Sequence, residues 1–398
     1  MPDSRAAPSP PLDYAGLRAA AEAFIPVLAA RAAETEALRR LPDATVAELK
    51  DAGLTRLCQP RRVGGAELPL DQAVDIMTVL ARGCASTAWV CGIYSDHAAT
   101  IGTFDARAVD DIWATDPTAL VSAGVTPGGK ATPDGADGWR LSGRWGWSSG
   151  CDFADWVMLS TVLSAHDDAP GGIHMCLVPR SDFTIVDDWH VMGMCGTGSK
   201  TVVVENAWVP RYRMLAAAAA ARGGASPAGR EAGALYRLSR PSTVPFFLVA
   251  PALGCAEAAL AAHIDDIGAR QSRGARVAEF PTAQMHVAEA AAEIDAARLL
   301  MMRDLRAAMA AAEAGEEWTM ADRARGRRDQ AYVGLLCRRA VDRLFTAAGG
   351  GGLMLSGDQQ RRFRDIHAIT AHLSMSWDIA ATTYGRIAFG LEPAGASI

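Results

Sequence analysis

Hydrophobic residues change their spacing twice along the chain, and each change marks a different kind of secondary structure. In residues 12–113 apolar side chains recur at intervals of three and four, which is typical of amphipathic helices. Residues 119–210 instead contain short runs rich in Val, Ile, Leu, Trp and Thr, separated by Gly, Pro and Asp, which predicts β-strands. From about residue 234 the helical spacing returns in long segments with short joints, as in an antiparallel helical bundle.

These patterns predict a mainly α-helical protein with a central β domain. We expect an N-terminal helical domain at residues 12–117, an antiparallel β domain at 118–214 and a C-terminal helical bundle at 234–398. Residues 215–233, rich in Ala, Gly, Ser and Arg, are interpreted as an exposed connection. Strands are expected at 120–125, 139–147, 156–163, 173–179, 183–186 and 201–209.

Capping and periodicity add detail to the helices. Thr45 and Glu48 have the spacing of a capping box. Three apolar stripes are expected to face the core of the bundle: Leu253, Leu260, Ile264 and Ile267; Leu299, Met302, Leu305 and Met309; and Leu336, Ala340 and Leu344. A last helix is expected to carry His367 and His372. Five residues apart, they lie about 140° apart around a helix, which makes a poor zinc site, so we expect no metal.

Residues 139–152 combine a rigid element with small hydroxyl groups. Alternate positions are aromatic or apolar on one face and polar on the other: Trp139, Leu141, Trp145 and Trp147 against Arg140, Ser142, Arg144 and Ser148. This strand ends in Ser148, Ser149 and Gly150, which can present two hydroxyl groups to a planar ligand. An amphipathic strand closed by a Ser-Gly turn fits the same pattern.

Two glycine-rich loops and one histidine are further candidates. Residues 122–129 and 194–199 are dense in glycine and hydroxyl residues; such loops can wrap a ligand with backbone N–H groups or serve only as turns. His97 lies on a helical stretch near Trp89 and Tyr94, where a histidine either fills the core or contacts a ligand.

Composition excludes several classes of partner. The chain has 398 residues, 50% of them hydrophobic, and its net charge of −6 contains no long run of one sign, so we expect no nucleic acid partner. Its 8 cysteines form no Cys-x-x-Cys pair and are interpreted as buried thiols in a reducing compartment. Without a signal-peptide pattern or an apolar run of about 18 residues, the protein is expected to be soluble and cytoplasmic, with no membrane partner.

Four motifs, set in this order of domains, resemble the acyl-CoA dehydrogenase superfamily. Within it they are most similar to the oxygenase components of two-component flavin-dependent monooxygenases, of the 4-hydroxyphenylacetate 3-hydroxylase and secosteroid hydroxylase type. The resemblance covers residues 12–391. The motifs are Gly-Cys-Ala-Ser-Thr-Ala-Trp at 83–89, Ser-Gly-Arg-Trp-Gly-Trp-Ser-Ser-Gly-Cys-Asp at 142–152, Gly-Thr-Gly-Ser at 196–199 and Arg-Asp-Ile-His-Ala-Ile-Thr-Ala-His at 364–372.

The resemblance implies a flavin between the β domain and the bundle. Ser148 would hydrogen-bond flavin N5, Trp147 would flank the ring with Ser149 beside it, and the phosphate or ribityl part would lie near Thr197, Gly198 and Ser199. One hydroxyl at N5 in an aromatic pocket suits a C4a-hydroperoxyflavin, which survives while N5 keeps its proton and water is excluded. Arg270 resembles the arginine that meets the cofactor phosphates across a subunit interface, and a glycine turn at 349–352 supplies Gly350 and Gly351.

One departure from the parent family separates an oxygenase from a dehydrogenase. Acyl-CoA dehydrogenases remove a proton with a glutamate on the first or last bundle helices, but residues 241–256 and 366–377 contain no acid. His372 stands in the second stretch and is the candidate proton-holding residue. By resemblance, the substrate pocket is lined by His97, Ser122, Arg240 and His372.

The resemblance therefore implies an enzyme that uses reduced FMN or FAD (FMNH2 or FADH2) and O2 to hydroxylate an aromatic, phenolic substrate. A separate NAD(P)H-dependent flavin reductase is expected, because no Gly-x-Gly-x-x-Gly motif follows a strand and opens a helix. A homotetramer is implied by the resemblance, and at least a dimer by the surplus of apolar stripes. The alternatives are an acyl-CoA dehydrogenase or amine N-oxygenase on the same fold, and a helical binding protein without cofactor.

Overall fold

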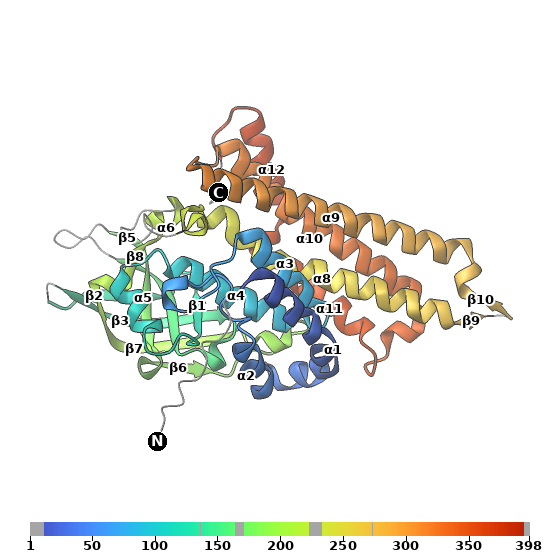
Figure 1. Cartoon of the computed structure of the whole chain (residues 1–398), viewed down its shortest axis with the longest axis horizontal. Helices are drawn as coiled ribbons and strands as arrows, with labels where there is room; N and C mark the ends of the chain where they lie inside the picture. Colours follow the sequence, from blue (N-terminus) through green and yellow to red (C-terminus); the bar gives the residue numbers. More distant parts are fainter. Residues whose placement is uncertain (1–11, 136, 164–170, 223–232, 273, 394–398) are drawn as a thin grey trace, which may run out of the picture.

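The computed structural model describes residues 12–135, 137–163, 171–222, 233–272 and 274–393. Figure 1 shows the β-sheet at one end of the molecule and the long bundle helices extending away from it. Helix α4 (Ala85–Ile101) lies between the two, because it contacts both strand β1 (Val121–Gly124) and helix α8 (Arg240–Ala269). All of its residues except Ile93 are buried, so α4 is the common wall of the sheet and the bundle.

The remaining N-terminal helices are α1 (Tyr14–Leu38), α2 (Asp43–Asp51), α3 (Leu70–Ala81) and α5 (Ala106–Trp113). The Asp13 side chain caps α1 by accepting from the N–H of Gly16 at 2.8 Å. The predicted capping box is wrong, because α2 begins two residues before Thr45. Thr45 and Glu48 instead bind the guanidinium of Arg31 on α1, at 3.1 and 2.6 Å, which fastens α2 to α1.

All six predicted strands are present, and the sheet contains two more. Its strands are β1, β2 (Gly129–Pro133), β3 (Gly138–Ser148), β4 (Trp156–Leu163), β5 (Gly172–Pro179), β6 (Phe183–Val186), β7 (Lys200–Pro210) and β8 (Met214–Ala216). Most neighbours are antiparallel, but β1 and β2 both pair with β4 in parallel, so the expectation of a purely antiparallel domain is wrong. The parallel pairing places Ser122 on a strand inside the sheet and not in a loop.

The C-terminal bundle consists of α8, α9 (Pro281–Ala314), α10 (Met320–Ala348), α11 (Gln359–Thr370) and α12 (Trp377–Ala388). One hydrophobic cluster joins α1, α3 and α4 to α8, α9 and α10, so both helical regions share a core. Two stripe positions are wrong: Ile264 and Leu299 are 47% and 72% exposed. The buried face of α9 consists of Ala290, Ile294, Ala297, Met301 and Leu305. The sequence pattern did not identify this face, because alanine is only weakly hydrophobic.

Helix α8 is long and apolar enough to cross a membrane, but its surroundings indicate a different role. Its most apolar window has a mean hydropathy of 1.8, and 72% of that window is buried inside the protein itself. A helix that is hydrophobic on all sides and covered by other helices is typical of the core of a large protein.

Candidate active site

Strand β3 leaves regular register where it reaches the predicted site. Trp145 pairs with Val202 and Ser148 pairs with Lys200, so β3 has one residue more than β7 between these pairs. The extra residue is a β-bulge, and within it Trp147 adopts a left-handed φ of 64°. The bulge reverses the alternation: Ser148 is fully buried, whereas Trp147 is 73% exposed.

The predicted aromatic face of β3 therefore ends at Trp145, and Trp147 is not part of it. Its ring meets the ring of Trp189 edge to face at 5.4 Å. A non-glycine residue at positive φ costs about 1 to 3 kcal/mol, and an exposed indole forgoes burial as well. Such strain is usually retained where a ligand uses the side chain.

Ser122 and Ser148 form a hydroxyl pair whose polarity is fixed by the backbone. Ser122 Oγ donates its hydrogen to the carbonyl oxygen of Ser149 at 2.8 Å. The 2.7 Å contact between Ser122 Oγ and Ser148 Oγ must then use the hydrogen of Ser148, because a hydroxyl has only one. Ser148 consequently has lone pairs but no hydrogen left for a ligand.

A second chain of hydroxyl groups runs from Ser149 to the glycine-rich loop, and a backbone carbonyl again determines which hydroxyl donates to which. Thr197 Oγ1 donates to the carbonyl oxygen of Met194 at 2.8 Å, so Ser199 must donate to Thr197 at 2.7 Å. Ser149 in turn donates to Ser199 at 2.8 Å and accepts from Trp89 Nε1 at 3.1 Å. Ser148 and Ser149 can therefore meet a ligand only as hydrogen-bond acceptors.

His97 is held in one tautomer. Its Nδ1 lies 2.8 Å from the carbonyl oxygen of Val121, which can only accept, so Nδ1 carries the proton. Burial lowers the pKa of His97 to about 4 and keeps the ring neutral at neutral pH. Nε2 is left as a hydrogen-bond acceptor.

His372 has the opposite tautomer. It lies between α11 and the short helix η9 (Leu373–Met375), and not on one helix with His367 as predicted. Its Nδ1 accepts from the N–H of Ser374 at 3.1 Å, so the neutral ring carries its proton on Nε2. His372 is partly open to solvent, and desolvation by the groups packed around its ring, followed by the nearby charge of Arg327, lowers the pKa of His372. The ring packs edge to face against Trp89 at 5.7 Å, which brings His372 next to the Ser149 hydroxyl chain.

Arg240 is buried at the start of α8 and pairs with Asp96 on α4. Its Nη2 also donates to the backbone carbonyl of Asp96 at 3.1 Å. Burial lowers the pKa of Arg240 to about 10, so the guanidinium stays charged at neutral pH. Nε and Nη1 of Arg240 are buried without a hydrogen-bond partner.

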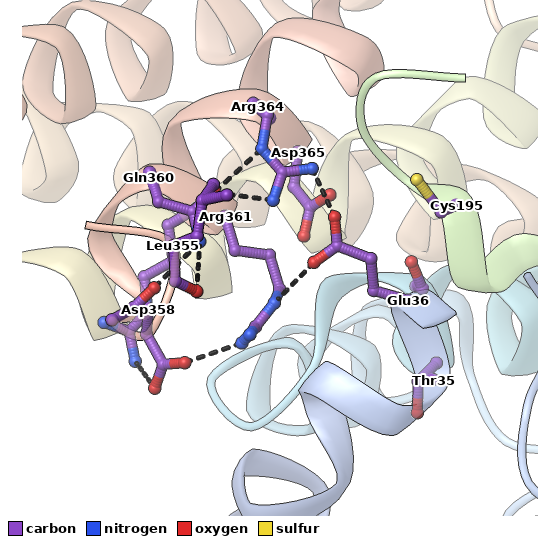
Figure 2. A network of polar contacts seen from close by, with 12 residues as sticks. Thr35, Glu36, Cys195, Leu355, Asp358, Gln360, Arg361, Arg364 and Asp365 are labelled. Atoms are coloured by element: carbon purple, nitrogen blue, oxygen red, sulfur yellow. Dashed lines mark hydrogen bonds and ion pairs between the residues drawn. The ribbon is translucent and has the colours of Figure 1, made fainter. Parts of the chain in front are cut away.

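A polar network joins Glu36 of α1 to arginines of α11 (Figure 2), and Asp365 of α11 also binds the glycine-rich loop. Glu36 on α1 accepts from Arg361 at 2.9 Å and also from Arg364. The neighbouring Asp365 accepts the N–H of Met194, at the start of the loop, at 2.6 Å. Burial raises the pKa of Asp365 to about 6. Because His372 follows α11 directly, this network sets its position relative to residues 194–199.

Arg270 and the glycine turn form a separate cluster. Arg270 Nη1 donates to the carbonyl oxygen of Ala348 at 3.0 Å, and a Cβ built on Gly351 would lie 2.8 Å from Arg270 Nη2. Figure 1 shows the adjoining β9–β10 hairpin (Gln271–Ser272 and Ala275–Arg276) at the end of the bundle away from the sheet. The 30 residues of α8 separate Arg240 from Arg270 by about 45 Å, so one cofactor cannot touch both ends within one chain.

The structure thus brings together most of the predicted site residues and adds four. Around α4 it assembles His97, Ser122, Ser148, Ser149, Thr197, Gly198, Ser199, Arg240 and His372, but it leaves Arg270, Gly350 and Gly351 apart. The additions are Trp89, Asp96, Arg327 and Asp365. Trp89, Asp96 and His97 share one helical face seven and eight residues apart, a spacing that is visible in the sequence. Among the described residues, no three His, Cys, Asp or Glu side chains are grouped as metal ligands.

Comparison with known proteins gives consistent matches. Two family models match: acyl-CoA dehydrogenase, N-terminal domain, over residues 14–107, and acyl-CoA dehydrogenase, C-terminal domain, over residues 246–377. The FADH(2)-dependent resorcinol hydroxylase, oxygenase component, of Rhizobium sp. is 37% identical over 92% of this chain and 91% of its own.

Solved structures agree with these matches. The HsaA monooxygenase from M. tuberculosis has a TM-score of 0.91 at 35% identity and covers 97% of this chain and 100% of its own. XiaF from Streptomyces sp., in complex with FADH2 and glycerol, has a TM-score of 0.89 at 28% identity, over 97% and 98% of the two chains.

Proposed function

The chain belongs to the acyl-CoA dehydrogenase superfamily, among the oxygenase components of flavin-dependent monooxygenases, and we propose that it uses reduced flavin and O2 to hydroxylate a phenol. The observation that carries this proposal is the polarity of the two hydroxyl chains. N5 of a reduced flavin bears a hydrogen, whereas N5 of an oxidised flavin has only a lone pair. Ser148 and Ser149 offer acceptors, so they match the reduced cofactor.

The surrounding residues also fit a flavin. Trp147 is a strained, exposed aromatic side chain beside the buried serines, as expected of a residue that covers a planar ring. The loop at Thr197, Gly198 and Ser199 would hold the ribityl or phosphate part. When bound, the reduced flavin supplies the electrons that activate O2 for insertion of one oxygen atom into the substrate ring.

The chain's own residues prepare the site and the substrate. Ser148 keeps the hydrogen on N5 by accepting from it, and the buried Trp89 and Tyr94 help to exclude water. A phenol is attacked more readily as its anion, and the Nε2–H of His372 can hold that anion by a charge-assisted hydrogen bond. His97 offers the complementary acceptor at its own Nε2.

Two carboxylates near the site are engaged in other bonds. Asp96 pairs with Arg240, and Asp365 holds the N–H of Met194. Neither is placed to remove a proton from an acyl chain as the dehydrogenases of this superfamily require. This supports the oxygenase over the dehydrogenase.

An oxygenase component needs a second protein that reduces the flavin, and we propose an NAD(P)H-dependent reductase in the cytoplasm. FMN and FAD both remain candidates for the cofactor. The position of Arg270 and Gly351 favours FAD, because this cluster would meet an adenine dinucleotide held by the serines of a neighbouring copy.

That arrangement implies a homo-oligomer, and we propose a tetramer. Leu353, Met354 and Leu355, next to the glycine turn, are 65%, 61% and 82% exposed, which is typical of a surface that a partner covers. Sedimentation at micromolar concentration should give a tetramer. An active monomer would contradict the proposal.

The experiment that tests the function supplies reductase, NADH and isotopically heavy O2 together with a panel of phenols. We expect a catechol-type product that carries one heavy oxygen atom. Consumption of NADH with hydrogen peroxide as the only product for every phenol, or reduction of the protein by an acyl-CoA, would contradict it.

A further inference from the structure

The buried ion pair between Arg240 and Asp96 bears on the chemistry of the substrate. Arg240 is 4% exposed and Asp96 is 5% exposed, so both charges are removed from water. The pair carries no net charge, yet Nε and Nη1 of Arg240 have no partner in the protein. A buried donor without an acceptor is unfavourable, so a ligand that accepts from Nε or Nη1 is stabilised.

Contacts place this pair beside the hydroxylation site. Along α4, Asp96 lies seven residues from Trp89, which is nearly the same face of the helix about 10 Å further along its axis. Trp89 contacts His372 and Ser149. Arg240 and His372 therefore contact the same face of α4, at Asp96 and at Trp89, about 10 Å apart along the helix axis.

Hydrogen bonds through the bundle also connect the His372 region to the start of α8. Arg327 Nη1 donates to the carbonyl oxygen of Ser374 at 2.6 Å and to Gln330 Oε1 at 3.2 Å. Gln330 Nε2 donates to the carbonyl oxygen of Ser242 at 2.9 Å, in the first turn of α8. Because the N–H of Ser374 donates to His372, these bonds connect His372 through α10 to Ser242, two residues after Arg240.

The charges of Arg240 and Asp96 determine which chemical group of a ligand can bind beside them. A carboxylate beside Arg240 would also lie beside Asp96, and two buried anions against one cation leave one negative charge uncompensated, which is unfavourable. A neutral oxygen, such as a hydroxyl, ketone or amide, accepts from Nε or Nη1 without adding charge. Arg240 alone would favour an anion, and Asp96 removes that preference.

Resting on the proposed function, we propose that this enzyme acts on phenols whose second polar group is an uncharged oxygen acceptor, and that Asp96 is the specificity-determining residue that excludes carboxylates. The pocket then takes a phenol at His372 and a neutral oxygen at Arg240.

The test compares ligands that differ only in charge. Two matched pairs are titrated by calorimetry: 4-hydroxyphenylacetamide against 4-hydroxyphenylacetate, and 3-hydroxybenzamide against 3-hydroxybenzoate. Each titration is run without flavin and with reduced flavin under anaerobic conditions, so no turnover is needed. We expect the wild-type protein to bind the amide about tenfold or more tightly than the acid in at least one pair. Preference for the acids, or no binding by any member up to millimolar concentration, would overturn the proposal.

A variant without the charge of Asp96 tests whether this residue causes the preference for neutral ligands. Asp96→Asn keeps the shape of the side chain but leaves Arg240 unopposed, so the preference should reverse toward the acid. The matched control is Asp75→Asn, because Asp75 is also a buried aspartate paired with arginines, Arg18 and Arg298, but in a different part of the fold. An unchanged preference in a folded Asp96→Asn protein would overturn the role of Asp96. If Asp96→Asn does not fold, the wild-type pairs still decide the proposal, and the heavy-oxygen experiment tests the hydroxylase activity separately.

Discussion

Ser122 and Ser148 face each other with hydroxyl oxygens 2.7 Å apart, and the carbonyl oxygen of Ser149 determines which of them donates. Because Ser122 donates to that carbonyl, the hydrogen of Ser148 points to Ser122, and its lone pairs remain for a ligand. If Ser148 is the partner of flavin N5, as we propose, this backbone carbonyl favours the reduced flavin, whose N5 carries a hydrogen. Substitutions of Ser148 and of Ser122 should therefore have different effects, the first on peroxide release and the second on the affinity for oxidised flavin.

Ser148→Ala removes the acceptor for N5–H and should leave flavin binding nearly intact. We expect the hydrogen peroxide released per NADH consumed to rise about tenfold, since one lost hydrogen bond contributes about 1 to 3 kcal/mol. Peroxide and product are measured together in one assay. Ser142→Ala, on the exposed face of the same strand, is the control and should change neither. If Ser149→Ala leaks peroxide and Ser148→Ala does not, the role belongs to Ser149.

Ser122→Ala should act differently, because it frees the hydrogen of Ser148. Ser148 can then donate to the lone pair of oxidised N5. We expect the affinity for oxidised flavin to rise by about tenfold while the affinity for reduced flavin changes little. Fluorescence titration of oxidised flavin measures this directly. Unchanged binding of oxidised flavin would show that the hydroxyl pair does not control the redox preference.

His372→Asn should slow hydroxylation about tenfold at pH 7, because the variant lacks the Nε2–H that we propose holds the phenolate. The deficit should shrink as pH rises toward the pKa of the free phenol, about 10, since the anion then forms without help. Single-turnover product formation across this pH range measures the effect. His367→Asn is the control, because His367 binds Asp342 at 2.8 Å elsewhere on the bundle. A His372→Asn variant with the wild-type rate at pH 7 contradicts this role.

His97 should make the fold sensitive to mild acid. Its pKa is lowered from 6.5 to about 4 by burial, so the unfolded chain binds a proton between these values and the folded protein does not. The stability that neutral His97 contributes is therefore lost as pH falls from 6.5 toward 4, by about 3 kcal/mol in full and roughly 2 kcal/mol by pH 5. Urea unfolding at pH 7 and pH 5 should show a smaller loss for His97→Gln than for the wild type. Equal losses in both proteins would mean that His97 does not titrate in this way.

The strands and long helices could be predicted because their side-chain periods are local. Trp139, Leu141 and Trp145 lie on the buried face as their alternation indicates. Trp147 breaks the pattern because a bulge arises from the pairing of β3 with β7, and that register depends on residues about 55 positions away.

Parts of the site were not accessible to sequence reasoning for similar physical reasons. The tautomers of His97 and His372 depend on the backbone atoms of Val121 and Ser374, which folding brings to the rings. The pairing of Asp96 with Arg240 joins helices 144 residues apart. Arg270 is predicted to bind the cofactor only through a resemblance, and its distance from Ser148 depends on the length and direction of α8.

We propose that the site is built for a reduced flavin that arrives by diffusion. The decisive measurement is an anaerobic titration that compares the dissociation constants of reduced and oxidised FMN and FAD. We predict that the reduced form of the preferred flavin binds at least about tenfold more tightly, in line with one well-matched hydrogen bond, and that the purified protein is nearly colourless. Equal affinity for both forms, or stoichiometric yellow flavin retained through dialysis, would contradict the account.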